Sequence, residues 1–350
     1  MGRAAALLGN RRAVAGALLL AALLAYYAFV AWLPNVPTPV DVLFVGFVLI
    51  PAVFALVMVA LPLREHRGRL AVALAFAALA VVAELGGLQL IANFAKLGAA
   101  TFVAFWFLGY FETVLWVALV ALLIPGVDAL SVWRGPTRHI IEERPQVFTV
   151  FSFAFPLPGE RQVGLRWSLP REGGAEEFFV VREPGPAEPL NEQPIRDRDG
   201  DGRTGFLEAE LDARRDYTYR IRAGRGADAA VAEAPAPWRD ADGEPRDVPD
   251  ASDPRAPREV TVTSTHAAAR LGIPDLLFFA LFLAAADRWA LRTRATWVAM
   301  AASFGITLAG AYFLWFDGLP ALPLLALAFL LVNADLLWRA FRARGTESAA

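Results

Sequence analysis

Two acidic residues lie inside apolar runs, one at each end of a long polar segment. Asp128 lies in the run IPGVDALSVW, and Asp275 lies in the run RLGIPDLLFF. A carboxyl group in hydrocarbon costs about 2.5 to 3.5 kcal/mol on insertion scales, so such residues usually face a partner, a cavity or a reaction. Two of them at one depth would suit a reaction that needs two carboxyls.

The distance of each acid from the nearest arginine predicts that both lie at one depth. Asp128 lies six residues before Arg134, and Asp275 lies five residues after Arg270. At about 1.5 Å per residue, each is expected roughly 7 to 9 Å below the outer membrane surface. Carboxyls held close together cannot both ionise cheaply, so such a pair shares one proton. The ionised member can take a proton from water while the neutral member donates to a scissile carbonyl, as in an aspartyl protease.

The composition indicates a protein that crosses a membrane several times. Apolar residues make up 57% of the 350 residues, which exceeds what a soluble domain needs. The net charge of -2 and the lack of a basic stripe argue against nucleic acid as a partner. The chain has no cysteine, which excludes disulfides, thiolate metal sites and a cysteine nucleophile and leaves the redox compartment open.

Apolar runs long enough to cross about 30 Å of hydrocarbon define the expected spans. The first, near Ala13 to Leu33, is too long for the core of a signal peptide and is expected to be a retained helix. The stretch from Leu70 to Trp133 has room for two or three helices. With three, broken near Gly86-Gly87 and between Tyr110 and Thr113, every arginine triplet that flanks a span falls on one face, as the positive-inside rule favours.

The expected fold is therefore an α-helical polytopic membrane protein of about eight helices with an inserted all-β sandwich. Both termini would be cytoplasmic, and the insert would be exocytoplasmic. The expected domains are an N-terminal membrane domain (1–134), the insert (135–268) and a C-terminal membrane domain (269–350). Abundant alanine, and arginine in place of nearly every lysine, are typical of a GC-rich prokaryotic genome and so suggest a prokaryotic plasma membrane.

The insert is rich in Pro, Gly, Asp and Arg and has short alternating strands, which is typical of a β-sandwich with Trp167 facing inward. The strand that begins at Tyr217 resembles the penultimate strand of fibronectin type III domains, with Tyr217 at the tyrosine-corner position. The stretch from Ala234 to Pro257 is expected to be an exposed loop. The expected strands are Gln162 to Leu169, Glu177 to Arg182, Gly205 to Leu211, Tyr217 to Ala223 and Glu259 to Thr263.

A candidate metal site lies inside the insert, where DRDGDGRTGFLE matches a calcium loop position by position. Its ligands would be Asp197, Asp199, Asp201, Arg203 through its carbonyl, and Glu208. No helices are expected to flank the loop, so an Asp/Gly turn between strands is an equally open reading. Bound calcium would stiffen the insert and would take no part in catalysis.

Around the two acids, the chain resembles the intramembrane aspartyl proteases of the presenilin and signal peptide peptidase family. The stretch VDALSVWRGPTRHIIEER around Asp128 is similar to the family segment that runs Tyr-Asp, an apolar stretch, Gly-Pro-Leu-Arg and then Glu and Arg. The stretch LGIPD before and including Asp275 is similar to the Gly-x-Gly-Asp motif. Near the start of the last span, Pro320, Ala321 and Leu322 reproduce the family's Pro-Ala-Leu.

The resemblance implies an intramembrane aspartyl endopeptidase in which Asp128 and Asp275 are catalytic and Gly272, with Pro320 to Leu322, contacts substrate. It implies transmembrane segments or signal-peptide remnants as substrates, locally unwound, with transmembrane proteins and the lipid bilayer as partners. It implies no cofactor for catalysis. The outward insert implies the orientation of signal peptide peptidase rather than that of presenilin, and we expect the sandwich to gate the site or recruit substrate.

The sequence departs from the family pattern at two positions. Val127 stands where the family has Tyr, which removes a hydroxyl near the first acid, and Pro274 stands where it has the second Gly. Proline fixes φ and lacks an N–H, whereas glycine permits close backbone approach. A catalytically inactive presenilin-like receptor or scaffold, which binds a partner through the sandwich, is therefore the alternative. A transporter that uses Asp128, Asp275 and Asp335 has less support.

Other ionisable residues of the apolar runs are expected to have local roles. Glu84 falls at a turn, and Lys96, inside a span, is expected to snorkel toward the surface. Asp335 is expected to pair with Arg339 one turn away, and Asp287 with the arginine that follows it.

Overall fold

The computed structural model divides into two units. It describes residues 2–34, 36, 38–134, 151–171, 176–197, 200, 202–212, 215–226, 228–238, 245–313 and 321–347. The helical unit comprises Met1–Ala28, Pro37–Phe155 and Ala269–Ala350, and the sandwich unit comprises Phe29–Val36 and Pro156–Ala268. Of the insert expected over 135–268, the described residues before Pro156 thus belong to the helical unit.

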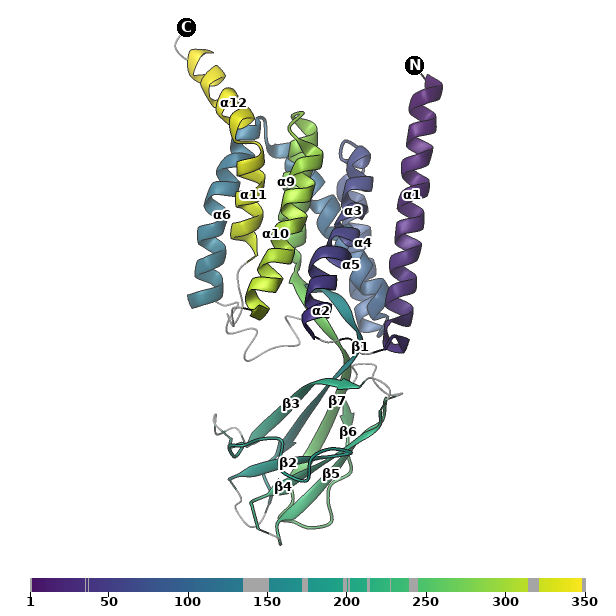
Figure 1. Ribbon diagram of the computed structural model, residues 1–350, viewed down its shortest axis with the longest axis vertical. Helices are drawn as coiled ribbons and strands as arrows, with labels where there is room; N and C mark the ends of the chain where they lie inside the picture. Colours follow the sequence, from purple (N-terminus) through teal and green to yellow (C-terminus); the bar gives the residue numbers. More distant parts are fainter. Residues whose placement is uncertain are drawn as a thin grey trace. The chain divides into compact units, whose positions relative to one another are not determined.

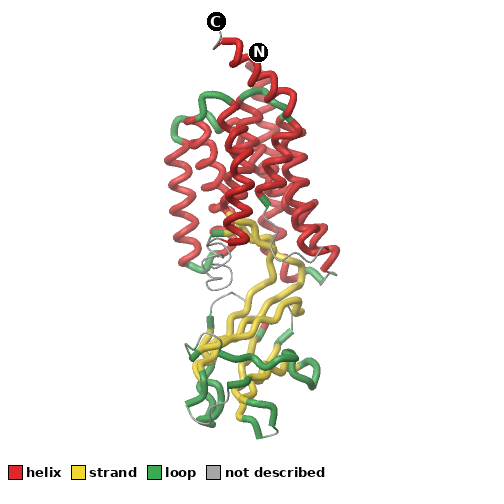
Figure 2. The backbone as a smooth tube through the Cα atoms, turned by 90° about the vertical axis from the view of Figure 1, so that its left-hand side faces the viewer, coloured by secondary structure: helices red, strands yellow, loops and turns green. Residues whose placement is uncertain are grey.

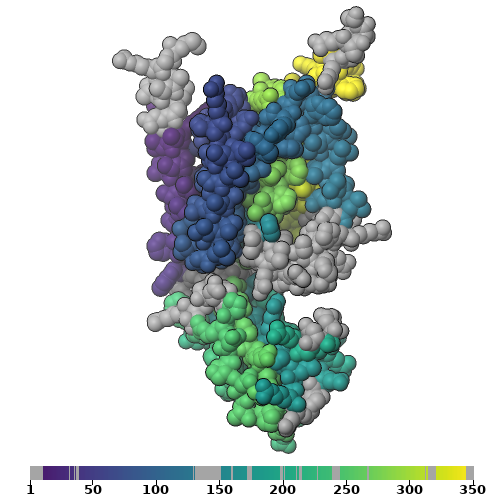
Figure 3. Space-filling model, turned by 180° about the vertical axis from the view of Figure 1, so that it is seen from behind, coloured from purple at the N-terminus to yellow at the C-terminus, as the bar shows by residue number. Residues whose placement is uncertain are grey.

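The N-terminal half of the helical unit is a series of apolar helices (Figure 1). The stretch after residue 68 holds three of them, with breaks at the two expected places. At the first break Gly87 has φ +69, a left-handed conformation that glycine adopts readily, and the N–H of Leu88 donates to the carbonyl of Ala83 at 2.8 Å. Figure 3 shows α4 and α5, in dark blue, side by side on one face of the unit. The elements are α1 (Gly2–Phe29), α2 (Thr38–Phe44), the π-helix η2 (Val45–Leu49), α3 (Ile50–Ala60), α4 (Arg69–Leu85), α5 (Gln89–Phe107) and α6 (Val114–Arg134).

Three helices of the described chain are long and apolar enough to cross a membrane: Arg11–Phe29, Pro39–Leu63 and Gln89–Tyr110. A fourth is counted if Leu322–Val332 and Ala334–Ala343, which meet at 68°, form one broken span. This is fewer than the expected number. The reason is partly length, since α4 has 17 residues and α9 has 16. The chain therefore has membrane-compatible helices together with a β-sheet region.

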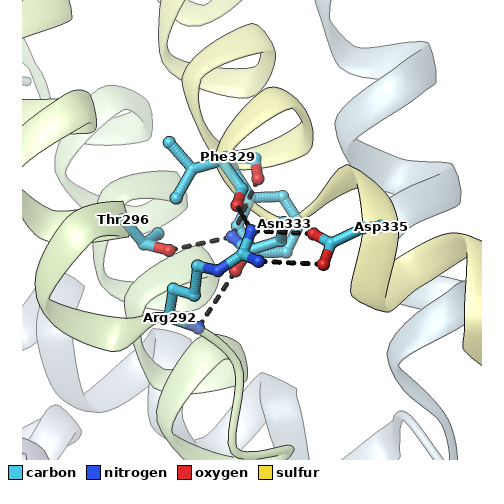
Figure 4. Close-up of polar contacts among 6 residues, drawn as sticks. Arg292, Thr296, Phe329, Asn333 and Asp335 are labelled. Atoms are coloured by element: carbon cyan, nitrogen blue, oxygen red, sulfur yellow. Dashed lines mark hydrogen bonds and ion pairs between the residues drawn. The ribbon is translucent and has the colours of Figure 1, made fainter.

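The C-terminal half of the helical unit comprises α9 (Ile273–Arg288), α10 (Thr293–Phe313), α11 (Leu322–Val332) and α12 (Ala334–Glu347). A polar network joins α10 to the bend between α11 and α12 (Figure 4). The Asn333 amide donates to Thr296 Oγ1 at 2.8 Å and to the carbonyl of Phe329 at 2.9 Å. The guanidinium of Arg292 donates to both oxygens of Asp335 at 2.7 and 2.8 Å.

Two expected ion pairs have other partners. Asp335 pairs with Arg292 across the bend rather than with Arg339. Asp287 pairs with Arg64 from the turn after α3 rather than with its neighbour in the sequence. Asp287 and Arg288 are adjacent on the helix and point in different directions, so a residue from another element reaches the Asp287 carboxylate. At Asp335, the guanidinium of Arg292 binds both carboxylate oxygens.

The sandwich unit contains a four-stranded sheet in the order β3-β1-β7-β6 and a three-stranded sheet in the order β2-β4-β5. Figure 2 shows the strands in yellow. Trp167 is 1% exposed and faces the core, as expected. Along β4 the residues Tyr217, Tyr219 and Ile221 alternate inward. The strands are β1 (Ser152–Ser168), β2 (Phe178–Glu183), β3 (Arg203–Asp212), β4 (Tyr217–Ala223), β5 (Ala230–Ala236), β6 (Arg246–Asp247) and β7 (Arg258–Gly272).

Part of the stretch that was expected to be an exposed loop forms strands. The loop prediction for Ala234 to Pro257 is wrong at two places, because β5 pairs with β4 and buries Ala234 and Ala236, and because β6 pairs with β7. Alanine and proline have low strand propensity, so the alternation AVAEAPA does not predict a strand.

The Tyr217 hydroxyl makes the backbone contact that is typical of a tyrosine corner. It accepts a hydrogen bond from the N–H of Asp212 at 3.2 Å.

Candidate active site

Asp275 lies in the first turn of α9, where strand β7 changes into a helix. Gly272 is the N-cap residue, with an extended backbone (φ -60, ψ 144). The Asp275 carboxylate accepts a hydrogen bond from the N–H of Gly272, as the third helical residue does in a capping box. Pro274 also lies in the first turn, where the N–H that it lacks would have no partner within the helix. The proline is therefore compatible with this helix start.

Space rather than backbone conformation restricts the residue at position 272. A Cβ added there would lie 3.1 Å from Oδ2 of Asp275 and 3.5 Å from Cδ of Pro274. Its φ of -60 is open to any residue. A larger side chain at Gly272 would therefore push directly on the Asp275 carboxylate.

Asp128 lies on α6, three residues after Pro125, which is inside the helix. The N–H of Leu322, at the start of α11, is directed at its carboxylate. The first N–H groups of a helix have no intrahelical acceptor and carry partial positive charge, so they favour a carboxylate there. The Oδ2 atom of Asp128 is buried and has no hydrogen-bond partner in the described part of the chain.

Packing among α6, α9 and α11 brings the two acids together. The carboxylate of Asp128 is close enough to that of Asp275 for their charges to interact. Each also faces a backbone N–H at the start of a helix, from Gly272 for Asp275 and from Leu322 for Asp128. Two carboxyls in one site favour a single shared proton. Such a pair can present one oxygen that accepts a proton beside one group that donates a proton.

The other residues expected at the site differ in whether the structure describes them and where it places them. Ala321 is the N-cap residue of α11, next to Leu322. Pro320 lies outside the described residues, as does the part of the first motif that follows Arg134. Val127 is 60% exposed.

A segment that the sequence analysis did not single out also reaches the helical unit. The first four residues of β1, Ser152–Phe155, which we call the hook, belong to this unit. Phe153 and Phe155 are 0% and 1% exposed, and both backbone groups of Ala154 bond to the side chain of Asn93 on α5. The sequence signals were a polar Asn in an apolar helix and the aromatic run FSFAF.

The snorkelling expected of Lys96 does not occur. Its ammonium lies 2.8 Å from the Glu84 carboxylate, with side-chain exposures of 8% and 16%. The turn at Gly86-Gly87 folds α5 back against α4, which brings the two residues together. Arg270 of β7 is close enough for its charge to interact with that of Glu84. Lys96 and Glu84 thus form a largely buried pair, and the exposed Arg270 lies near both Glu84 and Ser152 of the hook.

The calcium-loop residues are only partly described, since Asp199 and Asp201 lie outside the described residues. Asp197 accepts hydrogen bonds from the N–H groups of Gly200 and Gly202 at 2.9 and 2.8 Å. Glu208 lies on β3, where it binds Arg182 and accepts from the Tyr219 hydroxyl at 2.8 Å. Burial and then the charge of Glu208 raise the pKa of Tyr219. Within the described ranges no cluster of acidic or histidine side chains is suited to hold a metal ion.

Comparisons with protein-family models, with curated proteins and with solved structures find no match to this chain. Function is therefore inferred from the chemistry of the paired acids and from the motifs around them.

Proposed function

We propose that the chain is an intramembrane aspartyl endopeptidase with Asp128 and Asp275 as its catalytic pair. The observation that carries the proposal is the approach of the two carboxylates, each facing a backbone N–H at the start of a helix. The surrounding motifs resemble those of the presenilin and signal peptide peptidase family. The geometry uses residues of these motifs, since Gly272 and Leu322 supply the two N–H groups.

The proposed reaction starts from a pair that holds one proton. The ionised carboxylate removes a proton from water as the water oxygen attacks the scissile carbonyl carbon, and the neutral carboxyl donates its proton to the carbonyl oxygen. In the resulting diol the C–N bond then breaks. The nitrogen receives the proton taken from water, and the other carboxylate takes a proton from one hydroxyl. An acid and an amine leave, and the pair again holds one proton without having formed a covalent intermediate.

The chain's own backbone supports this chemistry. The N–H groups of Gly272 and Leu322 fix the direction of each carboxylate, so little reorganisation is needed when charge moves between them. Pro274 limits the backbone freedom of the residue before Asp275 without removing a helical hydrogen bond. The departure from Gly-x-Gly-Asp is thus compatible with activity.

Substrates are proposed to be transmembrane segments that unwind before cleavage, because the peptide bonds of a helix are shielded and hydrogen-bonded. Strand β7 leads directly into α9 and pairs with β1 on one side. On its other side, the described contacts of β7 are those of Val260, Thr261 and Val262 with the segment from Arg246 to Val248. We propose that an extended substrate segment pairs with the end of β7 that leads to Asp275.

The proposed topology has about eight spans, cytoplasmic termini and an exocytoplasmic sandwich in a prokaryotic plasma membrane. It is supported by contacts among arginine-bearing turns. Arg64, from the turn after α3, pairs with Asp287 at the end of α9. Arg288 donates to the carbonyl of Leu108 after α5 at 2.7 Å, and Arg292 reaches the start of α12. These turns therefore gather at one end of the helical unit, as a single arginine-rich face requires.

The sandwich is proposed to be fibronectin type III-like, supported by its tyrosine corner and by the β2-β4-β5 sheet. We propose that it recruits substrate or a partner. The exposed Val127, which supplies no hydroxyl beside Asp128, is the observation that favours the second candidate, an inactive receptor or scaffold.

The proposal is tested by binding of a peptide with a hydroxyethylene group, a mimic of the tetrahedral diol, to the full chain in lipid vesicles. Binding is expected for the wild type and is expected to be lost in Asp275→Ala. The control is Asp287→Ala, at the opposite end of the same helix, which should bind as the wild type does. Equal binding by all three proteins, or none by any, would favour the receptor or scaffold.

A further inference from the structure

The hook, Ser152–Phe155, is a piece of β-strand held inside the helical unit. Its aromatic side chains are buried, and Phe153 packs against Tyr27 of α1 and Phe94 of α5 with ring centroids 6.3 and 5.9 Å apart. A strand in an apolar environment needs partners for its backbone groups on both edges. β7 lies beside one edge of β1, and β3 pairs with the other edge from Glu160 to Ser168, so the hook requires a different partner on that second edge.

Asn93 supplies that partner. Its Nδ2 donates to the carbonyl of Ala154 at 2.7 Å, and its Oδ1 accepts from the N–H of Ala154 at 2.8 Å. The N–H and C=O of a strand residue point to the same side, so one amide side chain satisfies both, as the peptide group of a neighbouring strand would. The Tyr27 hydroxyl adds a second donor to the same carbonyl at 2.9 Å. Asn93 is itself 6% exposed.

The hook is tied in turn to the start of α9. The N–H of Ile273 donates to the carbonyl of Phe151, one residue before the hook, at 3.0 Å. Ile273 follows Gly272, the residue that donates to the Asp275 carboxylate. Arg270 of β7 reaches Ser152 Oγ at 3.4 Å. A continuous series of hydrogen bonds and backbone therefore runs from α5 through the hook to the first turn of α9.

We propose that Asn93 is a positioning residue for Asp275, which it holds in place through Ala154, Phe151 and Ile273 without touching the reacting atoms. This inference rests on the proposed protease function. A fixed α9 start keeps Asp275 at one distance from Asp128. Loss of the Asn93 amide frees the hook and lets the first turn of α9 move, which changes that distance.

The test uses the full chain in lipid vesicles and a quenched-fluorescent peptide reporter with one apolar span. Asn93→Leu keeps the size of the side chain and removes both hydrogen bonds, and Tyr27→Phe removes one donor to the same carbonyl. The matched control is Thr101→Val, a change of similar size at a buried position on the same helix. Because misplacement of a catalytic group by about 1 Å can reduce rates about 100-fold, kcat is expected to fall about 10- to 100-fold in Asn93→Leu. We expect a smaller fall in Tyr27→Phe, with KM little changed in both.

A second measurement separates this inference from the proposed function. Hydrogen exchange of the Ile273 amide, measured by mass spectrometry, reports how stable its hydrogen bond to Phe151 is, whether or not the reporter is cut. Exchange is expected to be faster in Asn93→Leu and Tyr27→Phe than in wild type and Thr101→Val. Cleavage with unchanged kcat in Asn93→Leu, or exchange unchanged in both variants, would overturn the positioning role alone. A wild type that does not cut would contradict the protease, while faster exchange would still support the hold on α9.

Discussion

The carboxylate of Asp275 accepts a hydrogen bond from the backbone N–H of Gly272, three residues earlier, at the point where strand β7 becomes helix α9. This contact fixes one side of the carboxylate and leaves its charge to interact with Asp128. Asp275 is thus oriented by the first turn of α9, which directly follows strand β7. The glycine leaves the space that the carboxylate occupies.

Replacement of Gly272 is expected to impair catalysis rather than substrate binding. A methyl group there would lie 3.1 Å from Oδ2 of Asp275, so Gly272→Ala should displace the carboxylate and lower kcat about tenfold or more. Gly126→Ala is the control, because a Cβ at Gly126, two residues before Asp128, would meet nothing within 4 Å. Reporter cleavage under saturating conditions checks both. Equal kcat in the two variants would contradict the proposed contact.

Replacement of Pro274 by glycine is expected to change activity little. The proline lies in the first turn of α9, where its missing N–H breaks no hydrogen bond. Pro274→Gly should therefore keep kcat within about threefold of the wild-type value. It should lower the free energy of unfolding by about 0.4 to 1 kcal/mol, because the unfolded chain gains conformational freedom. Cleavage rate and thermal midpoint measure the two effects. A large gain in kcat would mean that the proline holds the wild type in a poorly active form.

The pair Lys96–Glu84 is expected to contribute to stability only as a pair. Both side chains are mostly buried, so Lys96→Met alone leaves a carboxylate without its partner and should cost about 3 to 5 kcal/mol. The double variant Lys96→Met/Glu84→Leu should recover most of this loss. The exposed pair Arg203–Glu259 serves as control, since Arg203→Ala should cost less than about 1 kcal/mol. Thermal midpoints in vesicles compare all three, and a double variant as unstable as the single one would argue against the pair.

The sandwich is expected to lose stability in acid through Asp250. The N–H of Glu259, then Arg258, lower the pKa of this carboxyl below its usual range. A lowered pKa in the folded state means that the contribution is present above the unfolded value of about 4 and is lost as the pH falls through the folded value. Asp250 also holds Glu259, which has a φ of 46. Asp250→Asn should flatten this acid limb, followed through the near-ultraviolet signal of buried Trp167.

For comparison, the Asp253 carboxylate accepts hydrogen bonds from the backbone and side chain of Arg255, two residues away, and that arginine is the main cause of its lowered pKa. Asp253→Asn is therefore expected to have a smaller effect on the sandwich, because no other strand depends on the contact. Equal acid sensitivity of the wild type and Asp250→Asn would contradict the role of Asp250.

The sequence predicts elements whose signals are local. The break at Gly86-Gly87 follows from glycine's access to the left-handed region, and β4 follows from the alternation in YTYRIRA, whose bounds the structure reproduces. The candidate dyad follows from the cost of placing a carboxyl group in hydrocarbon. Each of these depends on a few neighbouring residues.

Contacts between distant residues were not predicted. The hook depends on Asn93 and Ala154, which are 61 positions apart, and the ion pair of Arg64 with Asp287 spans 223. The spacing of polar and apolar residues does not predict which distant residues pair, because any polar residue in an apolar helix has several possible partners. The sequence does not predict the start of β1 for the same reason, since Ala154 is bonded to Asn93 of α5, far away in the sequence.

The most direct test of the central claim is cleavage of the single-span reporter by the full chain in vesicles, with wild type, Asp128→Asn and Asp275→Asn compared. The account predicts cleavage by the wild type and loss in both variants, while Asp287→Asn, paired with Arg64 away from the dyad, retains it. Cleavage that survives in either dyad variant would contradict the proposed aspartyl mechanism.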